Sequence, residues 1–172
     1  MPPSPTTTLP AVLRDGSDAD LRAFLYDLFA AAGQLAAIRE SFAARLGMTG
    51  LQFHILMAVQ DLAPDGPVGI KQLSAHLRIA PPNATVEVSK LVAADLLEKR
   101  RAESDGRAVE IRLTRKANSA LNGLHPLVRD TNDRMFRDLD RTSFDTVRRS
   151  LAAIRRNGED VVASLRSPET VR

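Results

Sequence analysis

The stretch VGIKQLSAHLRIAPPNATVEVSKLVAADLLEKRRAESDGRAVEIRL, residues 68–113, determines the architecture expected of this chain. In its first part, apolar residues recur at helical spacing and predict a short helix over 70–77. Two prolines at positions 81 and 82 then begin a second helix, because proline in the first turn removes no hydrogen bond that the helix needs. This second helix is expected to run to about Ala94.

The apolar pattern then changes from helical to alternating, which predicts strands over 97–101 and 109–113. Residues 104–107, SDGR, supply the turn of a hairpin between them. Helix, turn, helix and hairpin in this order are typical of a winged helix-turn-helix. In that motif the second helix enters the major groove of duplex DNA. The hairpin extends sideways as a wing.

Charge is distributed unevenly along the chain. Between Val68 and Lys116, ten basic residues stand against six acidic ones, a net charge of +4 where the whole chain has +3. A basic segment of this kind is typical of a nucleic-acid-binding module. A solvated charged face gives the same count, so charge alone does not decide the function.

Composition excludes several classes of protein. Hydrophobic residues make up 44% of the 172 residues and charged residues 26%, as in an ordinary folded domain. The chain has no cysteine, which excludes disulfides, thiolate metal sites and thiol-based redox switches. We find no apolar run long enough to span a membrane and no signal-peptide pattern, so the protein is expected in the cytoplasm without membrane contact.

Neither a catalytic nor a metal site is expected. The sequence has no Gly-rich phosphate loop, no nucleophile elbow and no evident acid–base pair. Its histidines, His54, His76 and His125, do not stand at metal-ligand spacing. We therefore expect that the protein is not an enzyme and needs no cofactor.

Three stretches carry a resemblance to a known family: LVAADLLEKRR at 91–101, DGR at 105–107 and IRLTRK at 111–116. With Gln52 and Phe53, they resemble the MarR family of bacterial regulators over roughly residues 20–165. The resemblance implies a mainly α fold with a small β hairpin (α+β), a winged helix-turn-helix with N- and C-terminal dimerisation helices. It also implies a homodimer on a pseudo-palindromic operator, usually a repressor that a small aromatic or phenolic effector releases from DNA.

The long helices outside the winged segment have apolar residues three and four apart, as helices that bury one face do. Ser17 or Asp18 is expected to cap the first of them, and the last is expected to begin at about Ser143. Pro126 should kink the helix that contains it. The expected organisation is a flexible N-terminal arm (1–17), a dimerisation helix (18–46), the DNA-binding domain (47–113), C-terminal dimerisation helices (114–165) and a tail (166–172).

One position departs from the family pattern. Asp95 stands at the end of the second helix, where the family commonly has glycine. Glycine there accommodates a left-handed residue, and aspartate tolerates that conformation at some cost. The departure concerns where the helix ends and leaves the fold intact.

Several side chains of the winged segment are candidates for contact with DNA. Asn83 can read adenine, and Glu87 can accept a hydrogen bond from cytosine, although pairing with Lys90 at the surface is the preferred interpretation of Glu87. Asp105 is placed to orient Arg107 at the wing tip, from which an arginine reaches a narrow minor groove. The further candidates, mostly for phosphate contact, are Thr85, Ser89, Lys90, Lys71, Arg78, Lys99, Arg100 and Arg101.

Four residues are candidates for an effector pocket: Phe24, Phe29, Phe53 and His54. Aromatic residues at helical spacing are more often core, and a histidine such as His54 is more often a core or interface residue. The leading hypothesis is a ligand-responsive regulator of transcription that binds double-stranded DNA as a homodimer. The alternative is a winged-helix interaction module that binds protein or RNA.

Arg107→Ala should weaken binding to the operator strongly, because it removes the guanidinium that the wing presents to the minor groove. Thermal stability and dimerisation should stay almost unchanged. A fluorescence anisotropy or gel-shift titration measures the effect, and unaltered affinity would remove this role from Arg107.

Overall fold

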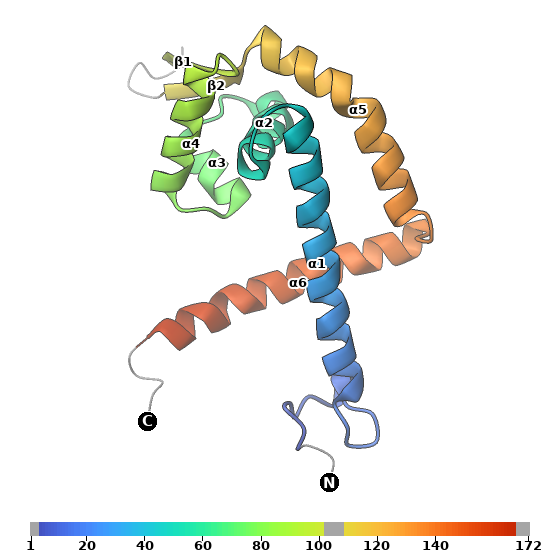
Figure 1. The fold of residues 1–172 in the computed structure, drawn as a ribbon. Helices are drawn as coiled ribbons and strands as arrows, with labels where there is room; N and C mark the ends of the chain where they lie inside the picture. Colours follow the sequence, from blue (N-terminus) through green and yellow to red (C-terminus); the bar gives the residue numbers. More distant parts are fainter. Residues whose placement is uncertain (1–3, 102–108, 168–172) are drawn as a thin grey trace. The chain divides into compact units, whose positions relative to one another are not determined.

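A computed structural model describes residues 4–101 and 109–167 (Figure 1). It divides into two compact units, residues 1–125 and 126–172. The mainly α fold with one hairpin agrees with the sequence prediction. The elements are η1 (Pro10–Val12), α1 (Ala19–Arg45), α2 (Gly50–Leu62), η2 (Ala63–Asp65), α3 (Ile70–Leu77), α4 (Pro81–Ala93), β1 (Leu97–Arg101), β2 (Val109–Leu113), α5 (Arg115–Phe136) and α6 (Arg141–Arg166).

Helix α2 begins with a capping box. The Gln52 backbone N–H donates to Thr49 Oγ1 at 3.3 Å, and the Thr49 N–H donates to Gln52 Oε1 at 3.1 Å. These bonds satisfy two donors that a helix N-terminus otherwise leaves without partners. On the other side, the Gly50 N–H donates to Glu40 Oε2 of α1 at 2.8 Å, so α1 also fixes the start of α2.

The core of the first unit lies among α2, α3, α4 and the hairpin, which cluster together in Figure 1. β1 and β2 pair antiparallel, with Lys99 opposite Ile111, and the Ile111 N–H donates to the Val68 carbonyl at 2.8 Å. The side chains that are almost completely buried there are Ile55, Leu56, Val59, Val68, Leu73, Val88, Leu91, Leu97 and Ile111. This burial fixes the orientation of α4, since each such side chain contributes on the order of 1.5–3 kcal/mol.

β2 departs from the clean alternation that its sequence predicts. Val109 is exposed while Glu110 is buried beside Ile111. Arg112 explains the difference, because its Nε and Nη2 donate to the two oxygens of Glu110 at 2.7 and 3.1 Å. A two-fold contact of this kind compensates a buried carboxylate.

The segment before α1 has local structure where a flexible arm was predicted. Asp18 precedes α1, but its side chain makes no capping bond to the helix, whereas the other predicted cap, Ser17, accepts from the Ala19 N–H through its Oγ at 3.3 Å. The Asp18 carboxylate instead accepts from Thr6 N at 2.8 Å and Thr6 Oγ1 at 2.7 Å, and it pairs with Arg22. The hydrogen bonds from Thr6 hold the pKa of the buried Asp18 carboxyl below its usual value.

Helices α5 and α6 begin with side-chain caps. The Ala117 N–H donates to Thr114 Oγ1 at 3.1 Å at the start of α5, and the Ser143 N–H donates to Asp140 Oδ1 at 2.7 Å. The cap at Asp140 starts α6 at Arg141, two residues before the predicted start. Pro126 lies inside α5, which continues to Phe136.

Helix α1 is more apolar than the sequence analysis allowed. It contains a stretch that is long and apolar enough, by length and composition alone, to cross a membrane, and this stretch is not buried. The expectation that no such run exists is therefore wrong. Its exposed large side chains are Phe24, Leu25, Tyr26, Phe29 and Leu35.

At the end of α4, an aspartate takes the left-handed conformation that glycine commonly adopts in the family. Asp95 is left-handed, with φ +57°. Its N–H donates to the Val92 carbonyl at 3.0 Å, and the Leu96 N–H donates to the Leu91 carbonyl at 2.9 Å. This is the Schellman arrangement of a helix C-terminus, which places α4's last residue at Ala93.

Asp95→Gly should raise the free energy of unfolding by about 1 kcal/mol, because glycine adopts the left-handed conformation without the steric cost that aspartate has. The matched control is Ala94→Gly, at a neighbouring residue with φ −84°, which should destabilise the protein. Urea unfolding at one protein concentration measures both. Equal effects of the two variants would contradict the assignment of strain to Asp95.

Candidate nucleic-acid interface

Helix α4 has one buried face and one exposed face. Ala84, Val88 and Leu91 point into the core and are almost inaccessible to solvent. The structure brings four predicted DNA contacts together on the exposed side: Asn83, Thr85, Ser89 and Lys90. The exposed face of α4 therefore starts two residues after its first proline, and it is polar except for Val86, which is 53% exposed.

The polar groups of this surface differ in how far they are engaged. Thr85 Oγ1 donates to the Pro81 carbonyl at 2.9 Å, and Ser89 Oγ donates to the Thr85 carbonyl at 2.8 Å. Both hydroxyls thus donate their proton to a backbone carbonyl of the helix, and their oxygens can still accept hydrogen bonds. Within the described parts of the chain, no hydrogen bond holds the Asn83 amide, which leaves its donors and its acceptor available to a base edge.

Glu87 faces α2, and each of its two carboxylate oxygens accepts a hydrogen bond. Gln52 Nε2 donates to Glu87 Oε2 at 3.0 Å, and Lys90 Nζ donates to Glu87 Oε1 at 2.6 Å. The bond from Lys90 is the main cause that lowers the pKa of this carboxyl. The preferred interpretation of Glu87, a partner of Lys90, agrees with the structure.

The contact with Gln52 is one that sequence reasoning missed. Gln52 uses its amide oxygen in the α2 capping box and its amide nitrogen on Glu87. One side chain therefore connects the start of α2 to the middle of α4. The capping pattern Thr49-x-x-Gln52 was the available signal, but the partner 35 residues away was not visible in it.

The described basic residues around α4 lie on α3 and at its end, and on β1. Lys71 is exposed on α3, and Arg78 ends that helix in the left-handed conformation, with φ +55°. Lys99 Nζ on β1 donates to Ser89 Oγ at 3.4 Å, and Arg100 pairs with Glu98 at 2.9 Å. Arg101 ends β1, while Asp105 and Arg107 lie outside the described residues. A basic rim of this kind attracts a phosphate backbone.

The C-terminal end of α4 is fastened by the residues that follow β2. Thr114 Oγ1 donates to the Asp95 carbonyl at 2.9 Å, and Lys116 Nζ donates to the Ala94 carbonyl at 2.9 Å. A cation at this position suits the negative end of the helix dipole. Lys116, which counts as one of the basic residues of the segment, thus holds α4 in place.

The predicted effector residues do not form one site in the described chain. Phe53 is only 6% exposed and packs on Phe42 with ring centroids 6.0 Å apart, whereas Phe24 and Phe29 are 45% and 72% exposed. Phe53 is therefore a core residue. His54 is exposed, 3.5 Å from Arg39 Nη1 through its Nδ1.

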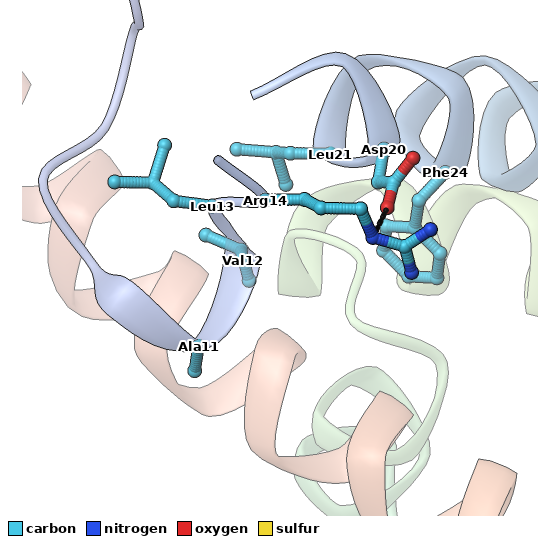
Figure 2. Close-up of a pocket in the computed structure, with 7 residues that line it drawn as sticks. All are labelled: Ala11, Val12, Leu13, Arg14, Asp20, Leu21 and Phe24. Carbon is cyan, nitrogen blue, oxygen red and sulfur yellow. Dashed lines mark ion pairs between the residues drawn. The ribbon is translucent and has the colours of Figure 1, made fainter. Parts of the chain in front are cut away.

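Phe24 lines a different cavity, of about 240 Å³, between the start of α1 and the segment before it (Figure 2). Leu21 and Phe24 face Val12 and Leu13 there, and Arg14 Nε lies 3.2 Å from Asp20 Oδ2. The other three predicted effector residues do not line this cavity. The effector pocket stays a prediction for Phe24, Phe29 and His54, whereas Phe53 packs in the core.

The surroundings of His54 are electropositive. Although the side chain is exposed overall, partial desolvation of its ring is the first cause that lowers the pKa of His54, and the nearby Arg39 and His76 lower it further. Arg39 also has a buried Nε that finds no hydrogen-bond acceptor among the described residues.

Comparisons with known proteins relate the chain to one family of regulators and to solved structures of similar fold. Residues 46–108 match the model of the MarR family. None of the curated proteins compared with the chain matches it.

Solved structures of similar fold cover most of the chain. The transcription regulator MarR from Oenococcus oeni PSU-1 is 20% identical over 76% of this chain and 97% of its own, with a TM-score of 0.66. A point mutant of MarR from E. coli, solved with operator DNA, is 20% identical over 76% and 92%, with a TM-score of 0.62. CouR from Rhodococcus jostii RHA1, solved with p-coumaroyl-CoA, is 18% identical over 76% and 90%, with a TM-score of 0.68.

Glu87→Gln should tighten binding to random duplex DNA several-fold and increase the salt dependence by about one ion, because the variant frees Lys90 for a phosphate. Anisotropy titrations across a range of salt concentrations measure both effects. Asp133→Asn, the same charge change at an exposed residue of α5, is the control and should change neither quantity. A selective loss of operator affinity would instead show that Glu87 reads a base.

Proposed function

Since residues 46–108 match the MarR family and the chain has the fold of MarR regulators, we propose that this protein is a sequence-specific, DNA-binding regulator of transcription. The observation that carries the proposal is α4, whose apolar face is buried while its exposed face presents unengaged hydrogen-bonding groups beside a hairpin. Such a helix reads base edges in the major groove.

The two parts of the binding free energy come from different residues. Asn83 and Thr85, near the start of α4, supply hydrogen bonds to bases, which determine sequence preference. Lys71, Lys99 and the wing residue Arg107 supply positive charge, and the release of counterions from phosphates gives most of the affinity. Because Glu87 holds Lys90, α4 itself contributes little free positive charge.

The protein acts as a homodimer in this proposal. Helix α6 has no buried residue, and its apolar side chains recur three and four apart in the described part of the chain. These side chains and the exposed ones of α1 need a partner, because large apolar surfaces on soluble proteins mark interaction sites. We assign a second copy of the chain as the partner, which matches a two-fold protein to a pseudo-palindromic operator. The exposed apolar residues of α6 are Phe144, Val147, Leu151, Ile154, Val161, Val162 and Leu165.

The regulator is a repressor that a small aromatic or phenolic molecule releases from DNA. CouR, which shares the fold, was solved with p-coumaroyl-CoA. In this chain, the support is that α1 presents exposed aromatic residues and that, further along the helix, Arg39 lies beside His54. The depressed pKa of His54 keeps the imidazole neutral near pH 7, so that it can exchange a hydrogen bond with a phenol.

Selection of bound sequences from genomic fragments tests the regulatory function. The fragments that the protein retains should share one pseudo-palindromic sequence near gene starts. Retained fragments without any common sequence, or equal retention of RNA, would overturn the proposal in favour of a different partner.

Leu151→Asp should convert the homodimer to a monomer and weaken operator binding at least ten-fold, because it places a charge in an apolar interface. Ala163→Asp adds the same charge to α6 on the side away from its apolar stripe, by the helical period, and should keep the dimer. Sedimentation velocity measures the state of each variant. A monomeric parent protein that floats with lipid vesicles would show that the apolar helices bind membrane instead.

A further inference from the structure

A second cavity, of about 590 Å³, lies entirely within the first unit. Its walls are the end of α2, the turn η2, the residues that follow it, strand β2 and the first turn of α5. The apolar part of the wall includes Val59, Ala63, Pro64, Val68, Ile111 and Leu113. The volume falls in the range of about 300–1,000 Å³ that small-molecule sites occupy.

The polar part of the wall includes one acidic and one basic side chain, whose charges balance. Glu110 and Arg112 both line the cavity, and they pair with each other through two bonds of 2.7 and 3.1 Å. Asn118 Nδ2 donates to the Thr114 carbonyl at 3.0 Å, while no described residue donates to Asn118 Oδ1. Gln60 adds a second amide at the rim.

From this lining we infer that the cavity binds a neutral small molecule with an apolar body and one hydrogen-bond donor. The donor pairs with Asn118 Oδ1, and the apolar body rests on Val59, Ile111 and Leu113. An ionised ligand is disfavoured, because the charged side chains that line the cavity in the described chain already neutralise each other and a buried charge without a partner is costly. The site is distinct from the aromatic and cationic residues of α1 and α2 assigned above to the effector.

Occupancy of the cavity bears on the DNA-binding surface. The Ile111 N–H donates to the Val68 carbonyl at the cavity wall, so a ligand there touches the contact that holds β2 to the rest of the unit. β2 leads directly to Thr114 and Lys116, which fasten the end of α4. A ligand in the cavity therefore changes the affinity for DNA, and this second step rests on the proposed function.

The fluorescent probe N-phenyl-1-naphthylamine tests the site in the full chain without DNA. The probe is neutral and apolar with one N–H, and the protein has no tryptophan to interfere with its signal. Binding should saturate and should weaken at least ten-fold in Ala63→Phe, which fills the cavity, and in Asn118→Leu, which removes the acceptor. Ala93→Phe, at an exposed alanine of the same unit away from the cavity, should bind the probe like the parent.

Equal probe affinity in all four proteins would overturn the site, since the probe then binds elsewhere. Because Asn118 also bonds to Thr114, amide NMR spectra establish that each variant is folded, and they should show probe-induced shifts at Ile111 and Leu113 in the parent. An anionic relative of the probe, 8-anilinonaphthalene-1-sulfonate, should bind this site at least ten-fold more weakly. Equal competition by the anion would overturn the inference of a neutral ligand.

Operator affinity with and without saturating probe tests the second step. A shift that is absent in Ala63→Phe supports coupling between cavity and DNA surface. An operator affinity that the probe does not change would overturn the coupling but not the proposed cavity site. Failure to bind any duplex would overturn the proposed function alone, because the probe titration contains no DNA.

Discussion

The burial of one face of α4 sets what the DNA-binding unit can present to a partner. Ala84, Val88 and Leu91 are packed against α2, α3 and the hairpin, and this packing leaves a mostly polar face of α4, with Val86 among its residues, toward solvent. If α4 could rotate about its axis against these elements, it would present no fixed set of hydrogen-bonding groups to a partner. Protein interiors are close-packed, so even a small rotation of α4 would open cavities.

Polar contacts at the middle and at the C-terminal end of α4 complete this constraint. Gln52 links α4 to the start of α2 through Glu87, and Thr114 and Lys116 hold the carbonyls at the other end. Gln52, Thr114 and Lys116 all belong to the stretches that carry the family resemblance. Their role is to position α4, and the positive charge for phosphates comes from other residues, such as Lys71 and Lys99.

Local sequence signals predicted the fold well where the determinant was local. The two prolines at 81 and 82 placed the start of α4, Thr49 placed the start of α2, and the alternation of 109–113 placed β2 with its observed bounds. Each of these depends on a backbone preference or a hydrogen bond within about four residues. The left-handed Asp95 followed from the family resemblance, because the family commonly has glycine at this place.

Local sequence signals did not predict the placement of side chains whose partners are distant in the sequence or on another element. Asp18 was one of two residues expected to cap α1, but its carboxylate accepts hydrogen bonds from Thr6 instead. Glu110 alternates with apolar residues and was expected outside, but Arg112 allows it to be buried. The four effector candidates were grouped by spacing, and tertiary packing sends Phe53 to the core and leaves Phe24 and Phe29 exposed. The site on α4 could be predicted because its outer face is set by one helix, whereas a pocket needs several elements at once.

Sequence readout by α4 is measured most directly by the ratio of affinities for a selected genomic duplex and for a scrambled duplex of equal length and composition. Anisotropy titrations at one physiological salt concentration give both values. Specific readout by α4 predicts a ratio of about 10³ or more. Equal affinities for the two duplexes would contradict it, because charge alone would then explain all binding.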